Sequence, residues 1–203
     1  KRISITIETV KKFSSLGFTI NIEKNYAKHL GIGDEEYQRA GAILNNSKKE
    51  VFEKLDIILN VKCPLADDID LIKNKSILIG QFDANFNKDE INKLIKNDIK
   101  VFSLNLLPRI TRAQSMDSLS SQANLAGYKA VIESFSMFEK AIPMMMTAAG
   151  TIPPAKVLVI GAGVAGLQAI ATAKRMGAIV FATDVRIAAK EQVESLGGKF
   201  LMV

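Results

Sequence analysis

Apolar and polar positions alternate with two different spacings through the first hundred residues. Short apolar runs, typical of buried strands, stand between segments with helical spacing. The pattern predicts strands over 18–23, 56–61, 76–80 and 99–103, and helices over 7–16, 34–40, 48–55 and 88–97. Thr6 and Ser47 are suitable N-caps, and Asn87 with Glu90 resembles a capping box. This alternation of strand and helix is the order that a layered β/α domain requires.

The second half of the chain has a different texture. A polar, hydroxyl-rich segment over 105–117 precedes a pattern that predicts one long helix over 118–140, and small residues then form a linker over 141–154. After the linker the pattern predicts a strand over 156–160, a helix over 164–176, a strand over 179–183, a helix over 188–196 and a strand from 199. Such a βαβαβ order implies a parallel sheet.

Composition places the chain among globular proteins. Of 203 residues, 48% are apolar and 24% are charged, and the net charge is +6. The basic residues are scattered, which disfavours nucleic acid as a partner. The single cysteine, Cys63, excludes an internal disulfide and leaves no metal-ligand spacing, so we predict no metal and a reducing compartment.

The ends of the chain and its longest uncharged run bear on its context. That run, 157–173, contains glycines and is shorter than the roughly 20 residues of a membrane-spanning helix, so no span is predicted. The chain opens at Lys1 without methionine and stops in a strand-like segment. We therefore expect it to be a piece of a longer protein.

A glycine motif follows the predicted strand 156–160 directly and opens a helix. Gly161, Gly163 and Gly166 have the GxGxxG spacing, and Asp184 stands 18 residues beyond Gly166 at the end of the next strand. In the dinucleotide fingerprint the first glycine permits a tight turn, the second lets a pyrophosphate approach and the third lets helix and strand pack closely. The predicted cofactor-binding residues are Gly161, Gly163, Val164, Ala165, Gly166, Asp184, Val185 and Arg186.

The residue types at the end of the second strand bear on which dinucleotide binds. The carboxylate of Asp184 is expected to accept hydrogen bonds from ribose hydroxyls and to repel a 2′-phosphate, which favours NAD over NADP. Arg186 complicates this selection because a cation tolerates the phosphate. We expect its side chain to face solvent or the pyrophosphate instead.

A general base for dehydrogenase chemistry is not obvious. The only histidine, His29, lies in an early loop, and Lys62 follows an apolar strand, where it is either a base or a solvent-facing residue. Hydride transfer between two nicotinamide rings needs no base. The segment 109–122 carries polar groups suited to a nicotinamide, but it reads equally as an interdomain hinge with Asp117 as a helix cap. The methionines at 144–146 are expected to fill a core or an interface.

Long stretches of the second half resemble the NAD-binding α subunits of proton-translocating NAD(P) transhydrogenases, within the alanine dehydrogenase/transhydrogenase superfamily. The residues that carry the resemblance are Arg109–Val131, Pro143–Arg175, Ala182–Arg186 and Glu191–Phe200. The first hundred residues fit more loosely, through Glu8–Lys12, Leu16–Phe18 and Ala40–Ala42.

The resemblance implies an α/β fold of two β/α domains. These are a flavodoxin-like N-terminal domain over 1–125 and a Rossmann-type NAD-binding domain over 126–203, incomplete in this chain. It also implies a catalytic set for the nicotinamide end. Arg109 and Asp117 would form a charge pair that shapes the loop, Gln114 and Ser120 would bond to carboxamide and ribose, and Asp184 matches the acid of the fingerprint.

The resemblance further implies partners and a reaction. Hydride would pass from NADH to NADP⁺ on a separate domain or β subunit, and a membrane domain would couple the transfer to proton movement. The protein would be a homodimer, peripheral on the cytoplasmic face of the inner membrane.

Two alternatives stay open. Alanine dehydrogenases share the fold, and Lys62 resembles their substrate lysine, but no histidine stands near Gln81–Asp83, where their substrate histidine is expected. The other alternative is a nucleotide-binding module without turnover.

Overall fold

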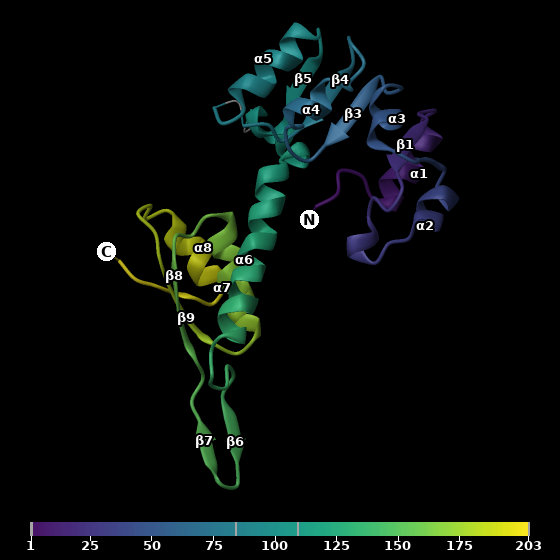
Figure 1. The fold of residues 1–203 in the computed structure, drawn as a ribbon. Helices are drawn as coiled ribbons and strands as arrows, with labels where there is room; N and C mark the ends of the chain where they lie inside the picture. The colour runs from purple at the N-terminus through teal and green to yellow at the C-terminus, as the bar shows by residue number, and fades with distance from the viewer. Residues whose placement is uncertain (1, 84, 109, 203) are drawn as a thin grey trace. The chain divides into compact units, whose positions relative to one another are not determined.

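A computed structural model describes residues 2–83, 85–108 and 110–202 of the chain, and it divides into two compact units, Lys1–Met116 and Asp117–Val203 (Figure 1). Both units contain parallel sheets whose strands alternate with helices, and the second unit also has an antiparallel hairpin. This arrangement confirms the predicted α/β class.

The strands described in the first unit form two parallel sheets, of order β1-β2 and β3-β4-β5. The elements are α1 (Ile7–Ser15), β1 (Ile20–Glu23), the 3-10 helix η1 (Lys28–Leu30), α2 (Asp34–Arg39), β2 (Ala42–Asn45), α3 (Lys48–Phe52), β3 (Ile57–Asn60), α4 (Ala66–Ile69), β4 (Ile77–Gly80), α5 (Lys88–Lys96), β5 (Lys100–Ser103) and the 3-10 helices η2 (Leu104–Leu106) and η3 (Thr111–Met116).

Each sheet of the first unit has its own apolar core. Val10 of α1, Ile22 of β1 and Tyr37 of α2 are buried against one sheet, and Leu78 of β4 and Leu94 of α5 are buried against the other. Burial of such side chains stabilises each layer by about 1.5–3 kcal/mol per residue. The two sheets therefore fold around separate clusters within one unit.

The second unit contains one three-stranded parallel sheet of order β10-β9-β8 and a hairpin. Its elements are α6 (Ser118–Ser136), β6 (Met145–Thr147), β7 (Gly150–Ile152), β8 (Lys156–Ile160), α7 (Val164–Arg175), β9 (Ile179–Thr183), α8 (Ala189–Ser195) and β10 (Lys199–Phe200). Val131 of α6, Ile170 of α7 and Val193 of α8 are buried in the same cluster as Val180 of β9, so these helices contribute to one core with the sheet.

Two predicted helix starts are confirmed by their cap bonds. Thr6 caps α1 by accepting a hydrogen bond from Thr9 N–H at 3.3 Å, and Ser47 caps α3 by accepting one from Glu50 N–H at 3.3 Å. Asn87 is different, because its side chain makes no cap bond and its Nδ2 donates to Asp83 O at 2.8 Å. The predicted capping box at Asn87 is therefore wrong.

Besides the short 3-10 helices, one strand and one α-helix of the first unit were absent from the sequence prediction. Strand β2 has only three apolar residues before Asn45, and asparagine is depleted in strands. Here Asn45 is buried, and its Nδ2 lies 3.3 Å from three acceptors, among them Ile22 O and Asn21 Oδ1, so tertiary partners satisfy a residue that propensity disfavours. Helix α4 spans only four residues, too few to show a helical period.

The predicted linker over 141–154 contains a β-hairpin instead. Strands β6 and β7 pair antiparallel, with Thr147 opposite Gly150, and Gly150 has a φ of +136°. Figure 1 shows this hairpin as an arm that extends away from β8 and β9. Its turn, Ala148-Ala149, lacks the Asn-Gly or Asp-Gly signal of a two-residue loop, so no local pattern indicated it. Helix α6 also ends earlier than predicted, at Ser136.

Candidate functional site

The glycine turn between β8 and α7 has the close packing that its spacing predicts. Gly161 has a φ of +97°, a conformation that L side chains rarely adopt, and its N–H donates to Thr183 O of β9 at 2.8 Å. A Cβ added to Gly166 would stand 1.8 Å from Gly161 O. The third glycine is thus required for the first turn of α7 to lie against the loop.

The N-terminus of α7 offers hydrogen-bond donors to an anion. Leu167 N–H donates to Gly163 O at 2.8 Å, so the preceding N–H groups, from Gly163 to Gly166, lie before the first intrahelical bond. No side chain caps this helix, and a Cβ added to Gly163 would meet nothing within 4 Å. A helix N-terminus with uncapped donors and an open approach fits a pyrophosphate.

Asp184 lies directly after β9 and is held firmly in place. Its side chain is 7% exposed, and its Oδ2 accepts a hydrogen bond from Ala162 N–H at 2.7 Å. Its Oδ1 accepts from Arg186 N–H at 2.8 Å and from Arg186 Nε at 3.0 Å. The side chain and backbone donors of Arg186, followed by the Ala162 amide, hold the pKa of the Asp184 carboxyl well below its usual range.

Arg186 is exposed to solvent and also makes a contact that the sequence did not predict. Its guanidinium forms an ion pair with Asp184, with Nη2 3.1 Å from Oδ2, although 62% of the side chain is exposed to solvent. The carboxylate in turn raises the pKa of Arg186. Val185, between them, is fully exposed. The structure thus brings the predicted cofactor residues together at the carboxyl edge of β8 and β9. The Asp184 carboxylate, which was predicted to favour NAD over NADP, is paired with the Arg186 guanidinium.

The polar segment before α6 is only partly described. Arg109 lies outside the described residues, and Gln114 is an exposed residue of η3 in the first unit. Asp117 caps α6, accepting hydrogen bonds at Oδ1 from Leu119 N–H at 3.1 Å and Ser120 N–H at 3.0 Å, and Ser120 Oγ donates to its Oδ2 at 2.6 Å. The cap alternative is therefore confirmed for Asp117, and Ser120 is held beside it.

The other residues considered for chemistry lie on the surface or have ordinary surroundings. His29 is an exposed residue of η1, and Lys62 is exposed just after β3. Burial raises the pKa of the half-buried Cys63 thiol, which keeps it protonated. The methionines at 144–146 are all exposed and fill no core in the described part of their unit.

Two residues that shape the site were missed from the sequence. Ala162 supplies the N–H that fixes Asp184, and such a backbone role leaves no signal in a side chain. Gly127 lies within α6, where a Cβ would stand 2.0 Å from Ala165 O of α7. A glycine inside a predicted helix costs about 1 kcal/mol relative to alanine, which is a signal that packing requires it.

Membrane spans and metal clusters are both missing from the described part of the chain. None of the helices there has both the length and the apolar character that crossing a bilayer demands. The same residues contain no group of three or more His, Cys, Asp or Glu side chains placed to hold a metal ion.

Family models match the two halves of the chain. The model described as alanine dehydrogenase/PNT, N-terminal domain, matches residues 1–126, and the model described as alanine dehydrogenase/PNT, C-terminal domain, matches residues 130–203. Together they take in nearly the whole chain.

The chain has relatives of known sequence and of known structure. It is 49% identical over 207 residues to an NAD(P) transhydrogenase subunit alpha of Rhodospirillum rubrum, covering 100% of this chain and 54% of the relative. A crystal structure of transhydrogenase from Sinorhizobium meliloti matches with a TM-score of 0.95 at 50% identity, over 99% of this chain and 60% of that one. A structure of L-alanine dehydrogenase matches with a TM-score of 0.82 at 21% identity, over 98% and 56%, which shows a shared fold. The chain spans about half the length of the curated relatives it matches.

Proposed function

Because the chain belongs to the alanine dehydrogenase/PNT family, we propose that it is part of the NAD(H)-binding component of a proton-translocating NAD(P) transhydrogenase. The observation that carries this choice within the family is the identity along the whole chain. It reaches 49% to a transhydrogenase subunit alpha and 29% to an alanine dehydrogenase from Methanococcus maripaludis.

The residues around α7 fit the dinucleotide that this role requires. The uncapped N–H groups of Val164, Ala165 and Gly166 would bind the pyrophosphate, and Gly163 would let it approach the backbone. The Asp184 carboxylate would accept hydrogen bonds from ribose hydroxyls. NADH, when bound, supplies a hydride.

The pairing of Asp184 with Arg186 refines how the site would select its nucleotide. Both oxygens of Asp184 already accept hydrogen bonds from this loop and its arginine. Ribose hydroxyls would share the remaining lone pairs or displace the exposed guanidinium, while the pairing lowers the local negative charge that excludes a 2′-phosphate. We infer a preference for NAD(H) that rests on the geometry of the carboxylate as much as on its charge.

The nicotinamide end is assigned to Arg109, Gln114, Asp117 and Ser120. The described contacts support one portion of this proposal, because Asp117 fixes the Ser120 hydroxyl through a 2.6 Å hydrogen bond while it caps α6. Gln114 is exposed on η3, and its side-chain amide is a group that hydrogen-bonds well to a carboxamide. These side chains would hold a ring in position and would take no proton, which suits direct transfer between two nicotinamides.

Partners follow from the same proposal. The second nucleotide, NADP⁺, would be bound by a separate domain or β subunit, and a membrane domain would couple hydride transfer to proton translocation. The component would act as a homodimer on the cytoplasmic face of the inner membrane. The names of the relatives, as subunits alpha, support the existence of a complementary subunit.

A two-arm assay tests the assignment. NADH oxidation by the protein as its gene encodes it is followed with NADP⁺ and an isolated transhydrogenase NADP-binding domain in one arm, and with pyruvate and ammonium in the other. Oxidation only in the first arm supports the proposal. Oxidation only in the second would identify an alanine dehydrogenase and direct attention to Lys62, and NADH binding without oxidation in either would identify a non-catalytic module.

Two matched variants, compared in the assay with NADP⁺, test whether Gln114 takes part in hydride transfer. Gln114→Ala is expected to lower the rate of hydride transfer, because one amide that orients the ring is lost. Gln38→Ala removes another exposed amide, from α2, and is expected to leave the rate unchanged. Equal rates for both variants would contradict the role of Gln114.

A further inference from the structure

The first turns of α6 carry polar residues on the face that its later turns bury. Residues seven apart in a helix lie on nearly the same face, because seven residues make about two turns. Gly127 and Val131 are both buried, and Val131 shares an apolar cluster with Ile170 of α7. Ser120 and Asn124 precede these two residues by seven positions each. They therefore continue the same face toward the start of α6.

Helix α7 runs in the same direction as α6 and covers only part of this face. Near the start of α7, a Cβ added to Gly127 would stand 2.0 Å from Ala165 O. After both helices have ended, a Cβ added to Gly177 would stand 2.8 Å from Cβ of Pro143. Figure 1 shows α7 beside the later turns of α6. The turns of α6 that precede Gly127 therefore extend beyond the amino-terminal end of α7.

The helical rise places Asn124 at the level of the proposed pyrophosphate. At about 1.5 Å per residue, Asn124 lies roughly 4.5 Å before Gly127 along α6, and Gly163 lies roughly 3 Å before Ala165 along α7. Asn124 is thus about level with the N-cap of α7, in front of the uncapped N–H groups. Ser120 lies roughly 6 Å further along α6. Along this face the amide and then the hydroxyl follow the order of a phosphate and its ribose.

The residue type at position 124 is unusual for its place. Asparagine is disfavoured inside helices, because its side chain competes for backbone hydrogen bonds. The face that it shares with Val131 is apolar where α7 covers it, yet Asn124 is exposed. Its amide offers two uncharged N–H donors. An exposed amide that prolongs a buried face indicates that a polar group lies against this part of α6.

Building on the proposed function, we propose that Asn124 is a further binding residue for the dinucleotide, with its Nδ2 donating to the phosphate on the nicotinamide side. The N–H groups at the start of α7 would bind the remaining oxygens of the pyrophosphate. Gly127 is then a positioning residue, because the close approach that it permits fixes the distance between Asn124 and those N–H groups. The two helices would bind one pyrophosphate from two sides.

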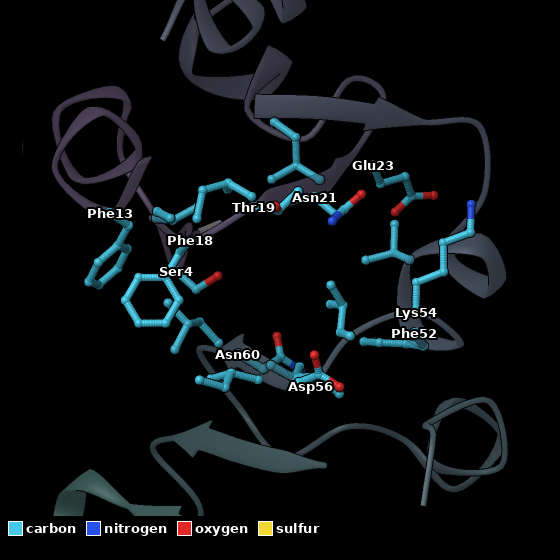
Figure 2. Close-up of a pocket in the computed structure, with 18 of the residues that line it drawn as sticks. Ser4, Phe13, Phe18, Thr19, Asn21, Glu23, Phe52, Lys54, Asp56 and Asn60 are labelled. Carbon is cyan, nitrogen blue, oxygen red and sulfur yellow. The ribbon is translucent and has the colours of Figure 1, made fainter. Parts of the chain in front are cut away.

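A hollow in the first unit offers a different chemistry. It measures about 880 Å³, and Figure 2 shows Phe13, Phe18 and Phe52 among the side chains that line it. Aliphatic side chains of β1 and β3 complete much of the lining. Such groups give a phosphate no hydrogen bonds in return for the water that it loses. Of these two open surfaces, the face of α6 is the one suited to a charged ligand.

Titrations with three nucleotides test the proposal. Kd values for NADH, ADP-ribose and AMP are measured by calorimetry with the protein as its gene encodes it. ADP-ribose contains the pyrophosphate without nicotinamide, and AMP contains only the phosphate on the adenosine side. Asn124→Ala is expected to raise the Kd for NADH and for ADP-ribose roughly 10- to 100-fold, and to change the Kd for AMP less than about twofold.

Two further variants separate binding from stability. Asn124→Asp keeps the size of the side chain but places a carboxylate beside the pyrophosphate, so it is expected to weaken NADH and ADP-ribose binding more than Asn124→Ala does. Asn92→Ala removes an exposed asparagine from α5 and is expected to leave all three Kd values unchanged. Both alanine variants are expected to keep or raise the urea unfolding midpoint, because alanine is the better helix former.

Three results would overturn the inference. Equal Kd values for NADH in the unchanged protein and in Asn124→Ala would remove Asn124 from the site. A loss of AMP affinity as large as that of ADP-ribose would mean that Asn124 acts through the fold or the adenosine half. Absence of NADH binding by the unchanged protein would overturn the proposed function together with this inference, whereas the first two results leave the proposed function standing.

Discussion

A substitution at Gly163 is expected to weaken dinucleotide binding while it changes the stability of the second unit little. The perturbation is Gly163→Ala, which adds one methyl group at the N-cap of α7. The backbone of Gly163 has a φ of −78° and a ψ of −169°, which alanine adopts without strain, and the added Cβ would meet no atom within 4 Å. The folded protein therefore has room for this side chain.

The expected magnitudes differ between folding and binding. Loss of a glycine N-cap in favour of alanine costs up to about 1 kcal/mol, while the reduced freedom of the unfolded chain returns about 0.4–1 kcal/mol. The free energy of unfolding is thus expected to change by less than about 1 kcal/mol. A methyl group between the backbone and a pyrophosphate costs about 1–3 kcal/mol, which weakens NADH binding by about 5- to 150-fold.

The assay combines a titration with an unfolding curve. The chain contains no tryptophan, so NADH fluorescence is read without indole emission, and urea unfolding is followed by circular dichroism. Gly166→Ala serves as the comparison, because its Cβ would stand 1.8 Å from Gly161 O and must lower both stability and affinity. An unchanged Kd for NADH in Gly163→Ala would refute the assignment of the loop, and an unfolding loss as large as that of Gly166→Ala would refute the open space around Gly163.

Three further predictions concern the same unit. Arg186→Ala is expected to return the pKa of Asp184 toward its ordinary value. A depressed carboxyl pKa stabilises the folded state at pH values above the ordinary pKa, and this stabilisation is lost as the pH falls through the native pKa. The pH midpoint of acid unfolding should therefore be higher in Arg186→Ala than in the unchanged protein, whereas in an Asp184→Asn background Arg186→Ala should not raise it. Asp117→Ala is expected to lower the free energy of unfolding, measured in urea, by about 0.5–2 kcal/mol, because the N-cap of α6 is lost. Asp117→Asn retains a side-chain oxygen that can accept the cap bonds and is expected to keep most of that stability. Equal losses in the two variants would contradict the capping role. Gly127→Ala is expected to destabilise by about 1–3 kcal/mol against Ala165 O, and a gain of up to about 1 kcal/mol from helix propensity would show that the helices do not approach so closely.

The α/β class and the glycine turn before α7 were predictable because both depend on local order. The strand Ile179–Thr183 and the glycine turn at Gly161 are read from adjacent residues, and the structure places them as expected. Strand β2 and the β6-β7 hairpin were not predictable, because their polar or unusual residues are stabilised by partners that the local pattern does not contain. Tertiary context decided those elements.

The candidate site likewise has features that the sequence predicts and features that only the structure reveals. Residue types and spacing predicted a candidate site at Gly161, Gly166 and Asp184, but not the ion pair that Asp184 makes with Arg186 two residues later. A side chain of that length can turn in several directions, and only the packed loop selects one. Backbone donors such as Ala162 N–H are invisible to any pattern of side chains.

The hairpin of β6 and β7 gives the protein a chemical reporter. Met144, Met145 and Met146 stand in succession on or beside its first strand, with 57%, 48% and 73% of each residue open to water. Accessible thioethers convert readily to sulfoxides, which reductases reverse, whereas sheltered ones resist peroxide. Mass spectrometry after brief peroxide treatment would therefore reveal, in any mixture, whether another molecule lies over this arm.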